Sequence, residues 1–158
     1  MRSRDLEELS KEELINLVKL YSKDPLTGLK MRRDFELQYE ALFETGEDFY
    51  LTMIDINGLH NINKLQGYDA GDNLIRKVVE YLKYHCQGSG DIFRLGGDEF
   101  VILSKKIHKE CLETKNFCIS TVVRKDFNNS GAMFTRVDEL VIQSKADFYK
   151  SNGNNRRV

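Results

Sequence analysis

Three carboxylates lie next to predicted extended segments, and adjacent strands could hold two of them, Asp55 and Glu99, close enough to share a metal ion. Asp55 ends an apolar run, and Asp98 and Glu99 directly follow the pair Gly96–Gly97. Carboxylates held close together repel each other, and a hard divalent cation removes that repulsion; Mg²⁺ typically binds one or two carboxylates together with phosphate oxygens and water. Since the chain has no P-loop signature, these residues favour a metal-bound nucleoside triphosphate on a palm-like sheet. The alternative is an exposed hairpin whose acids only confer solubility.

The two adjacent acids lie at the tip of a predicted β-hairpin over residues 93–103. Apolar residues alternate on both sides of Gly96 and Gly97, and the glycine pair predicts a two-residue turn in which both residues have positive φ. Glycine also lets a ligand approach the backbone closely. Neighbouring strand residues point to opposite faces, so we expect Asp98 and Glu99 to have different roles.

The remaining elements, which must position these residues, follow from hydrophobic periodicity. Apolar residues at helical spacing predict helices over residues 5–22, 31–43, from 69–73 onward, and 137–149, and β-formers predict strands over 49–56 and 116–123. We expect a turn around Pro25, a short helix in 105–115, a loop over 126–131 and a short strand in 153–158. The predicted fold class is α/β (α+β), with a mixed central β-sheet flanked by helices, related to the ferredoxin-like arrangement.

The sequence predicts a capping box in the first of these helices and a specific apolar face in the second. In the first, Ser10 and Glu13 form a capping box that would start a helix within the segment. In the second, the apolar face is predicted to consist of Phe35, Leu37, Tyr39, Leu42 and Phe43.

Composition limits the function classes. The 158 residues fit one domain, and a net charge of −1 argues against binding to a nucleic-acid polymer. The sequence has no apolar segment long enough for membrane insertion and no signal-peptide pattern, so we expect a cytoplasmic protein. Cys86, Cys111 and Cys118 form no C-x-x-C pair, which disfavours a disulfide framework or a zinc site.

The N-terminal helix leaves the domain organisation open. Residues 1–22 are either a helix packed on its own domain or a short dimerising stalk. We expect the domain proper to span residues 23–158.

Several ordered motifs give a resemblance to a known family. The pentapeptide Gly96–Phe100 reads GGDEF and begins two residues after Arg94. Residues 24–35 resemble the motif D-x-L-T-G-L-x-N-R-R-x-F, and residues 55–74 resemble D-I-D-x-F-K-x-I-N-D-x-x-G-H-x-x-G-D-x-x-L. The tail 150–156 is a looser match to A-K-x-x-G-R-N-R. The chain therefore resembles the GGDEF family of diguanylate cyclase domains.

The resemblance implies an activity and a set of roles. A homodimer would condense two GTP molecules into cyclic di-GMP plus pyrophosphate, with Mg²⁺ or Mn²⁺ as cofactor. Asp98 and Glu99 would be catalytic, Asp98 by assisting deprotonation of the attacking 3′-hydroxyl. The metal ligands implied are Asp55, Glu99 and the backbone carbonyl of Ile56. The substrate-binding residues implied are Asn63 and Asp72 for guanine, Gly96 and Gly97 for close approach, and His60, Lys150 and Arg156 for the phosphates.

The chain also departs from the family pattern. Asn57 replaces the second aspartate, His60 replaces a lysine, and Asn154 stands where an arginine is usual, although Arg156 is near enough in sequence to substitute. The R-x-x-D product-inhibition motif is absent, its place being taken by residues 87–90. Compared with the family pattern, we expect the domain to be shortened after Leu103. These departures favour, as an alternative, a catalytically weak or inactive domain that acts as a GTP-binding regulatory module.

Overall fold

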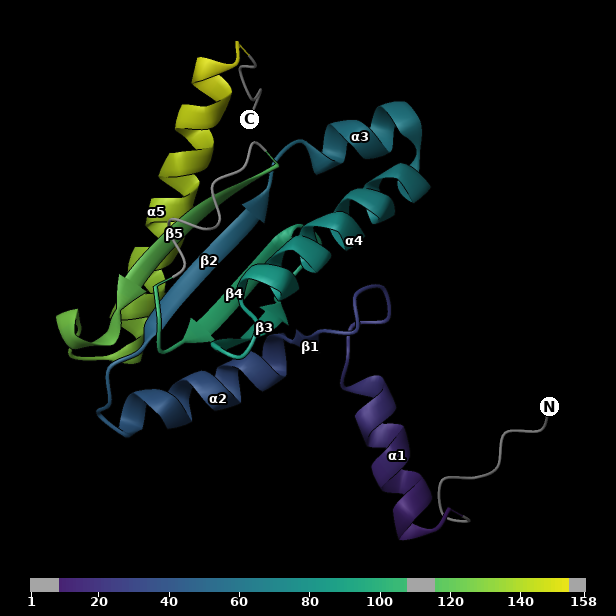
Figure 1. Ribbon diagram of the computed structural model, residues 1–158, viewed down its shortest axis with the longest axis vertical. Helices are drawn as coiled ribbons and strands as arrows, with labels where there is room; N and C mark the ends of the chain where they lie inside the picture. Colours follow the sequence, from purple (N-terminus) through teal and green to yellow (C-terminus); the bar gives the residue numbers. More distant parts are fainter. Residues whose placement is uncertain (1–8, 108–115, 154–158) are drawn as a thin grey trace.

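Five strands form one mixed sheet with helices on both faces (Figure 1). The structure is a computed structural model that describes residues 9–107 and 116–153. The strands are β1 (Lys30–Met31), β2 (Tyr50–Ile56), β3 (Gly90–Arg94), β4 (Glu99–Ser104) and β5 (Phe117–Val123), in the order β1-β3-β4-β2-β5. The helices are α1 (Lys11–Tyr21), α2 (Arg32–Glu44), α3 (Leu59–Gln66), α4 (Tyr68–His85) and α5 (Ser130–Ser151), with a short 3₁₀ helix η3 (Arg124–Asp126). The predicted mixed sheet flanked by helices is confirmed.

The central strand β2 pairs with β4 on one side and β5 on the other, both antiparallel. Its apolar sequence allows burial on both faces, because successive side chains point in opposite directions. Leu51 and Met53 join one core, whereas Ile54 and Ile56 join the other. Leu51, Met53 and Asp55 are spaced two residues apart, so the Asp55 side chain points to the same face of the sheet as the other two.

Each face of the sheet is covered by a different set of helices. The first core contains apolar side chains from α2 and α5, among them Phe35, Tyr39, Met133, Val137 and Val141. The second contains the α4 residues Ile75, Val78, Val79 and Leu82. Asp55 therefore faces the layer of α2 and α5, and this choice of face decides which side chains can reach it.

Some boundaries and faces differ from the predictions. Helix α5 begins at Ser130, earlier than residue 137, because the Asn129 side chain accepts a hydrogen bond from the Ala132 N–H at 2.7 Å and caps the helix. The predicted loop over 126–131 is correspondingly shorter. Leu37 is 66% exposed and does not belong to the buried face of α2. The predicted helix in 105–115 and the strand in 153–158 fall largely outside the described residues.

Helix α1 extends away from the sheet in Figure 1. The predicted capping box is present, with the Glu13 N–H donating to Ser10 Oγ and the Ser10 N–H donating to Glu13 Oε2. Leu14, Ile15, Val18 and Tyr21 are all exposed. These apolar side chains consequently add little to the core of the domain.

Two further predictions concern membranes and cysteines. Within residues 9–107 and 116–153, no helix combines the length and apolar character needed to cross a bilayer. Cys86 and Cys118 are buried free thiols, and Cys111 lies outside the described residues.

Candidate active site

Asp55 and Glu99 are brought together by strand register. Asp55 is the penultimate residue of β2 and Glu99 the first of β4, and the two are directly opposite in the antiparallel pair. The Ile56 N–H donates to the Asp98 carbonyl at 2.9 Å and extends this pairing by one bond. Burial, followed by the negative charges of Asp55 and Asp98, raises the pKa of Glu99. The nearby Arg32 charge lowers this pKa, but it does not outweigh burial and the two neighbouring carboxylates.

The hairpin is confirmed, but the two-residue turn is wrong. Four residues, 95–98, separate β3 from β4, and neither Gly96 nor Gly97 is among the glycines with positive φ. The Arg94 guanidinium accounts for the wider loop, because it donates to the Gly96 carbonyl at 3.0 Å and to the Gly97 carbonyl at 2.8 Å. A Cβ at Gly96 would lie 3.3 Å from Glu99 Oε2, a tight contact that a small shift of this carboxylate would relieve.

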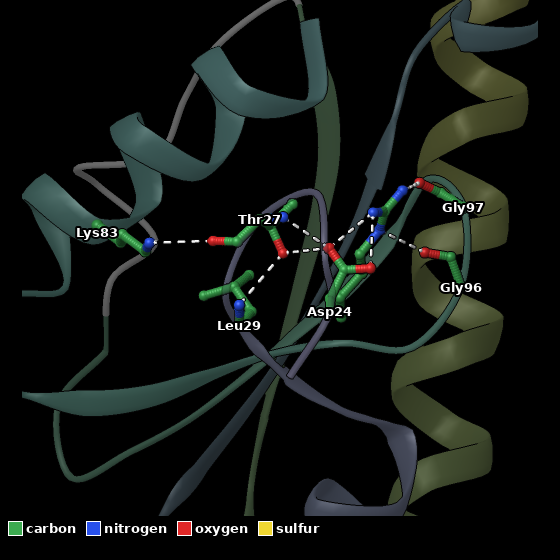
Figure 2. A network of polar contacts seen from close by, with 7 residues as sticks. Asp24, Thr27, Leu29, Lys83, Gly96 and Gly97 are labelled. Carbon is green, nitrogen blue, oxygen red and sulfur yellow. Dashed lines mark hydrogen bonds and ion pairs between the residues drawn. The ribbon is translucent and has the colours of Figure 1, made fainter. Parts of the chain in front are cut away.

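Asp24 fixes the arginine that holds this loop (Figure 2). Arg94 Nη1 lies 3.0 and 2.9 Å from the two Asp24 carboxylate oxygens, and both side chains are largely buried. The Thr27 N–H and hydroxyl donate to Asp24 Oδ2, so the turn around Pro25 is tied to the same carboxylate. Burial alone would raise the pKa of Asp24, but the hydrogen bonds from Thr27 and Arg94 outweigh it and lower that pKa.

Lys145 is a site residue that the sequence analysis missed. Its Nζ forms an ion pair with Asp55 Oδ1 and lies 3.5 Å from Asp98 Oδ2. The Lys145 side chain is only 5% exposed. A signal was present in the sequence: Met133, Val137, Val141 and Lys145 are spaced four residues apart, so a lysine occupies the next position of a buried apolar stripe.

Asp98 and Glu99 do not lie on opposite faces as predicted. Asp98 belongs to the loop and precedes the first residue of β4, so strand alternation does not apply to it. It reaches Lys145 of α5, while Glu99 Oε2 lies 3.8 Å from Arg32 Nη2 at the start of α2. Because α2 and α5 cover the same face of the sheet, the two acids belong to one charged cluster.

The donors present suit a hard divalent cation. Asp55 and Glu99 offer carboxylate oxygens, and Ile56 follows Asp55 with a backbone carbonyl at the end of β2. Within the described parts of the chain, no group of three or more His, Cys, Asp and Glu side chains has metal-binding geometry. The chain's donors therefore fit an ion that takes its remaining ligands from water and phosphate, as Mg²⁺ does.

A second cluster lies where α3 meets α4. The Asn63 side chain packs against Gly71, where a Cβ would approach Asn63 Oδ1 to 1.8 Å, and Gly71 immediately precedes Asp72. Asn63 Oδ1 is buried and, among the described residues, has no hydrogen-bond donor. A buried acceptor left without a donor is costly, so this oxygen is suited to receive a hydrogen bond from a ligand.

Comparisons with known proteins identify the family of this chain. Residues 21–140 match the family model described as diguanylate cyclase, GGDEF domain. The chain belongs to the GGDEF family. It is 30% identical over 120 residues to the diguanylate cyclase VdcA of Vibrio cholerae and 32% identical over 113 residues to the diguanylate cyclase DosC of Escherichia coli. These alignments cover 73% and 68% of this chain, but only 35% and 23% of the two relatives.

Solved structures show the same fold. This GGDEF domain superposes on the coiled coil and GGDEF domain of DgcB from Caulobacter crescentus, solved in complex with c-di-GMP, with a TM-score of 0.74 at 20% identity. That match covers 92% of this chain and 89% of the other. The GGDEF domain of FimX from Pseudomonas aeruginosa matches with a TM-score of 0.72 at 17% identity, covering 80% and 94% of the two chains.

The predicted phosphate-binding residues of this GGDEF domain do not form a cluster among the described residues. His60 is exposed in the first turn of α3, and Lys150 is exposed in the last turn of α5. Lys150 follows Lys145 by five residues, so it points about 140° away around the helix axis. Arg156 lies outside the described residues. Asn57 is buried, and its Oδ1 accepts a hydrogen bond from Cys118 Sγ at 3.2 Å.

Proposed function

We propose that this domain is a diguanylate cyclase that condenses two GTP molecules into cyclic di-GMP with release of pyrophosphate. The observation that carries the proposal is the register of β2 and β4, which sets Asp55 opposite Glu99 and ties the Asp98 carbonyl to the Ile56 N–H. Together with family membership, this arrangement supports a metal-dependent nucleotidyl transfer at the end of the sheet.

Asp55, Glu99 and the Ile56 carbonyl would hold Mg²⁺ or Mn²⁺. When bound, the ion would neutralise phosphate charge and favour departure of pyrophosphate. Asp98 would accept the proton of the 3′-hydroxyl as the new bond from this oxygen to the α-phosphorus forms and the bond to pyrophosphate breaks.

Guanine would bind between α3 and α4. The unpaired Asn63 Oδ1 is an acceptor, and the Asp72 carboxylate next to Gly71 is another. Guanine offers an N1–H and an exocyclic N2–H₂ group, whereas adenine has no amino group at position 2. Two acceptors at this place therefore favour GTP over ATP. His60 and Lys150 would contact the phosphates, and Arg156 would take the role of the missing arginine.

Two copies of the chain are needed, because each would hold one of the two GTP molecules that are joined. The exposed apolar residues of α1, Leu14, Ile15, Val18 and Tyr21, offer a surface on which two chains could associate. The N-terminal helix would then be the dimerising stalk of a GGDEF domain that begins near residue 23.

The test is turnover with GTP and Mg²⁺, with the products separated by chromatography. Cyclic di-GMP and pyrophosphate should form, and turnover per chain should rise with protein concentration because the reaction needs two chains. Replacing Val18 by glutamate should move this rise to higher concentration. Absence of cyclic dinucleotide at high protein concentration would contradict the cyclase proposal.

A GTP-binding regulatory module is the second candidate. It is favoured by the ion pair between Lys145 and Asp55 and by the substitution of phosphate-binding residues at His60 and Asn154. Such a module would be stabilised by GTP against thermal unfolding without producing cyclic di-GMP. ATP, which lacks the N2 amino group, serves as the matched control ligand in both measurements.

A further inference from the structure

The position of Lys145 combines core burial with contact to the active site. Helix α5 packs Met133, Val137 and Val141 against the sheet, and Lys145 is the next residue of this stripe. On the facing strand, Leu51 and Met53 are followed, two residues on, by Asp55. The apolar contact between α5 and β2 thus ends in an ion pair. An ammonium buried this deeply must have charged partners, because an isolated buried charge is very costly.

Two cationic side chains of the protein lie next to the carboxylates of the site. Lys145 Nζ is paired with Asp55 and lies 3.5 Å from Asp98, and Arg32 Nη2 lies 3.8 Å from Glu99. The two cations differ in their surroundings: the side chain of Arg32 is 50% exposed, whereas that of Lys145 is 5% exposed. Solvent screens the arginine, so the lysine is the stronger competitor for any added cation.

We propose that Lys145 is a resident cation of this site. In the metal-free protein its ammonium neutralises Asp55 and Asp98, and a divalent ion binds Asp55 only by displacing it. The inference depends on the proposed function in one respect, namely that Asp55 is a metal ligand. Two charges of the same sign cannot both remain in contact with one carboxylate in a largely buried site without strong repulsion. The four-carbon stem of lysine provides the rotatable bonds that let its ammonium move away.

The experiment measures Mn²⁺ binding to the full chain by isothermal titration calorimetry, without nucleotide. Lys145→Met removes the competing charge and should bind Mn²⁺ at least about tenfold more tightly than the wild type, which corresponds to about 1.4 kcal/mol. Lys77→Met is the matched control, because Lys77 is exposed on α4 and its loss changes the net charge equally. Its Mn²⁺ affinity should stay within about twofold of wild type, as expected for a screened surface charge.

A second readout follows the ammonium directly. In ¹⁵N-labelled protein, the side-chain NH₃⁺ signal of Lys145, assigned by its loss in Lys145→Met, should shift when Mg²⁺ is added. If Lys145→Met does not fold because Asp55 loses this ion pair, Lys145→Gln provides a neutral side chain that can still donate a hydrogen bond to Asp55. This variant should show the same gain in Mn²⁺ affinity.

The outcomes separate this inference from the cyclase proposal. Equal Mn²⁺ affinity in wild type and in a folded Lys145 variant would overturn the inference and leave the metal site in place. An unmoved NH₃⁺ signal at saturating Mg²⁺ would do the same. Failure of both proteins to bind Mn²⁺ at millimolar concentration would overturn the metal site and the inference with it. A tenfold gain without any cyclic di-GMP production would support the inference while removing the cyclase activity.

Discussion

The two ends of the candidate site are prepared for a ligand in opposite ways. At the proposed metal-binding end, Asp55, Asp98 and Glu99 already face the protein cations Lys145 and Arg32. At the proposed base-binding end, the Asn63 Oδ1 atom is buried and has no donor among the residues that the structure describes. A base could therefore add a hydrogen bond to Asn63, whereas a metal ion would have to exchange with a charge that is already present. We expect nucleotide binding and metal binding to be separable by substitution.

Glu99→Gln tests the metal-binding end and should have the largest effect. It removes a metal-binding carboxylate while keeping the shape of the side chain, so metal-dependent turnover should fall at least about 100-fold. Stabilisation by GTP in the presence of EDTA should persist, because the contacts at Asn63 and Asp72 are unchanged. Near-normal turnover would show that the metal is held elsewhere, and loss of GTP binding would show that the two ends are not independent.

The same variant has an expected pH dependence in the metal-free protein. The pKa of Glu99 is raised in the folded state, so its ionisation costs stability, and this cost appears as the pH rises from about 4.5, the value expected when unfolded, through the folded pKa. Glu99→Gln should therefore be slightly more stable than wild type at pH 7, by less than about 1 kcal/mol because the side chain is partly exposed. Urea denaturation at pH 7 and pH 4.5 should show this difference shrinking at the lower pH.

Gly71→Ala tests the base-binding end. The new methyl group would meet Asn63 Oδ1 at 1.8 Å and force the amide away from its position. Affinity for GTP should fall about tenfold, which is the size of one lost hydrogen bond, about 1.4 kcal/mol. Affinity for Mn²⁺ should be unchanged, as measured by calorimetry. Gly131→Ala is the control, because a Cβ there meets Asn129 Oδ1 at an ordinary 3.4 Å.

Asp24→Asn should have the smallest effect, and it acts on the metal-binding end from a distance. The substitution leaves the Arg94 charge without its ion-pair partner, which should cost about 1–2 kcal/mol of unfolding free energy, less than for a fully buried pair. The pKa of Asp24 is lowered in the folded state from its ordinary value of 3.8. The stabilisation that ionised Asp24 provides is therefore complete above that ordinary value, and it is lost as the pH falls through the lower pKa of the folded state. Urea denaturation curves of the wild type and of Asp24→Asn should therefore converge in strong acid.

The sequence was sufficient for some parts of the site and insufficient for others. The positions of Asp55 and Glu99 at the ends of two apolar strands predict their proximity, because paired strands leave few possible registers. The loop shape could not be predicted in this way, since it depends on Arg94 binding the carbonyls of Gly96 and Gly97. The partners of Lys145 also require tertiary information: the four-residue spacing marks it as buried but does not say which strand residue α5 places beneath it.

Helix α5 links the packing of the core to the chemistry of the site. Met133, Val137 and Val141 set the height and rotation of this helix over β2, and Lys145 follows them on the same face. Protein cores are densely packed, so removing methyl groups from this stripe leaves a cavity, and the surrounding structure, including α5, relaxes partly into it. Val141→Ala would thus alter the distance between an ammonium and two carboxylates without touching a polar atom. At the proposed metal site, the packing of an apolar interface would in this way contribute to ion affinity.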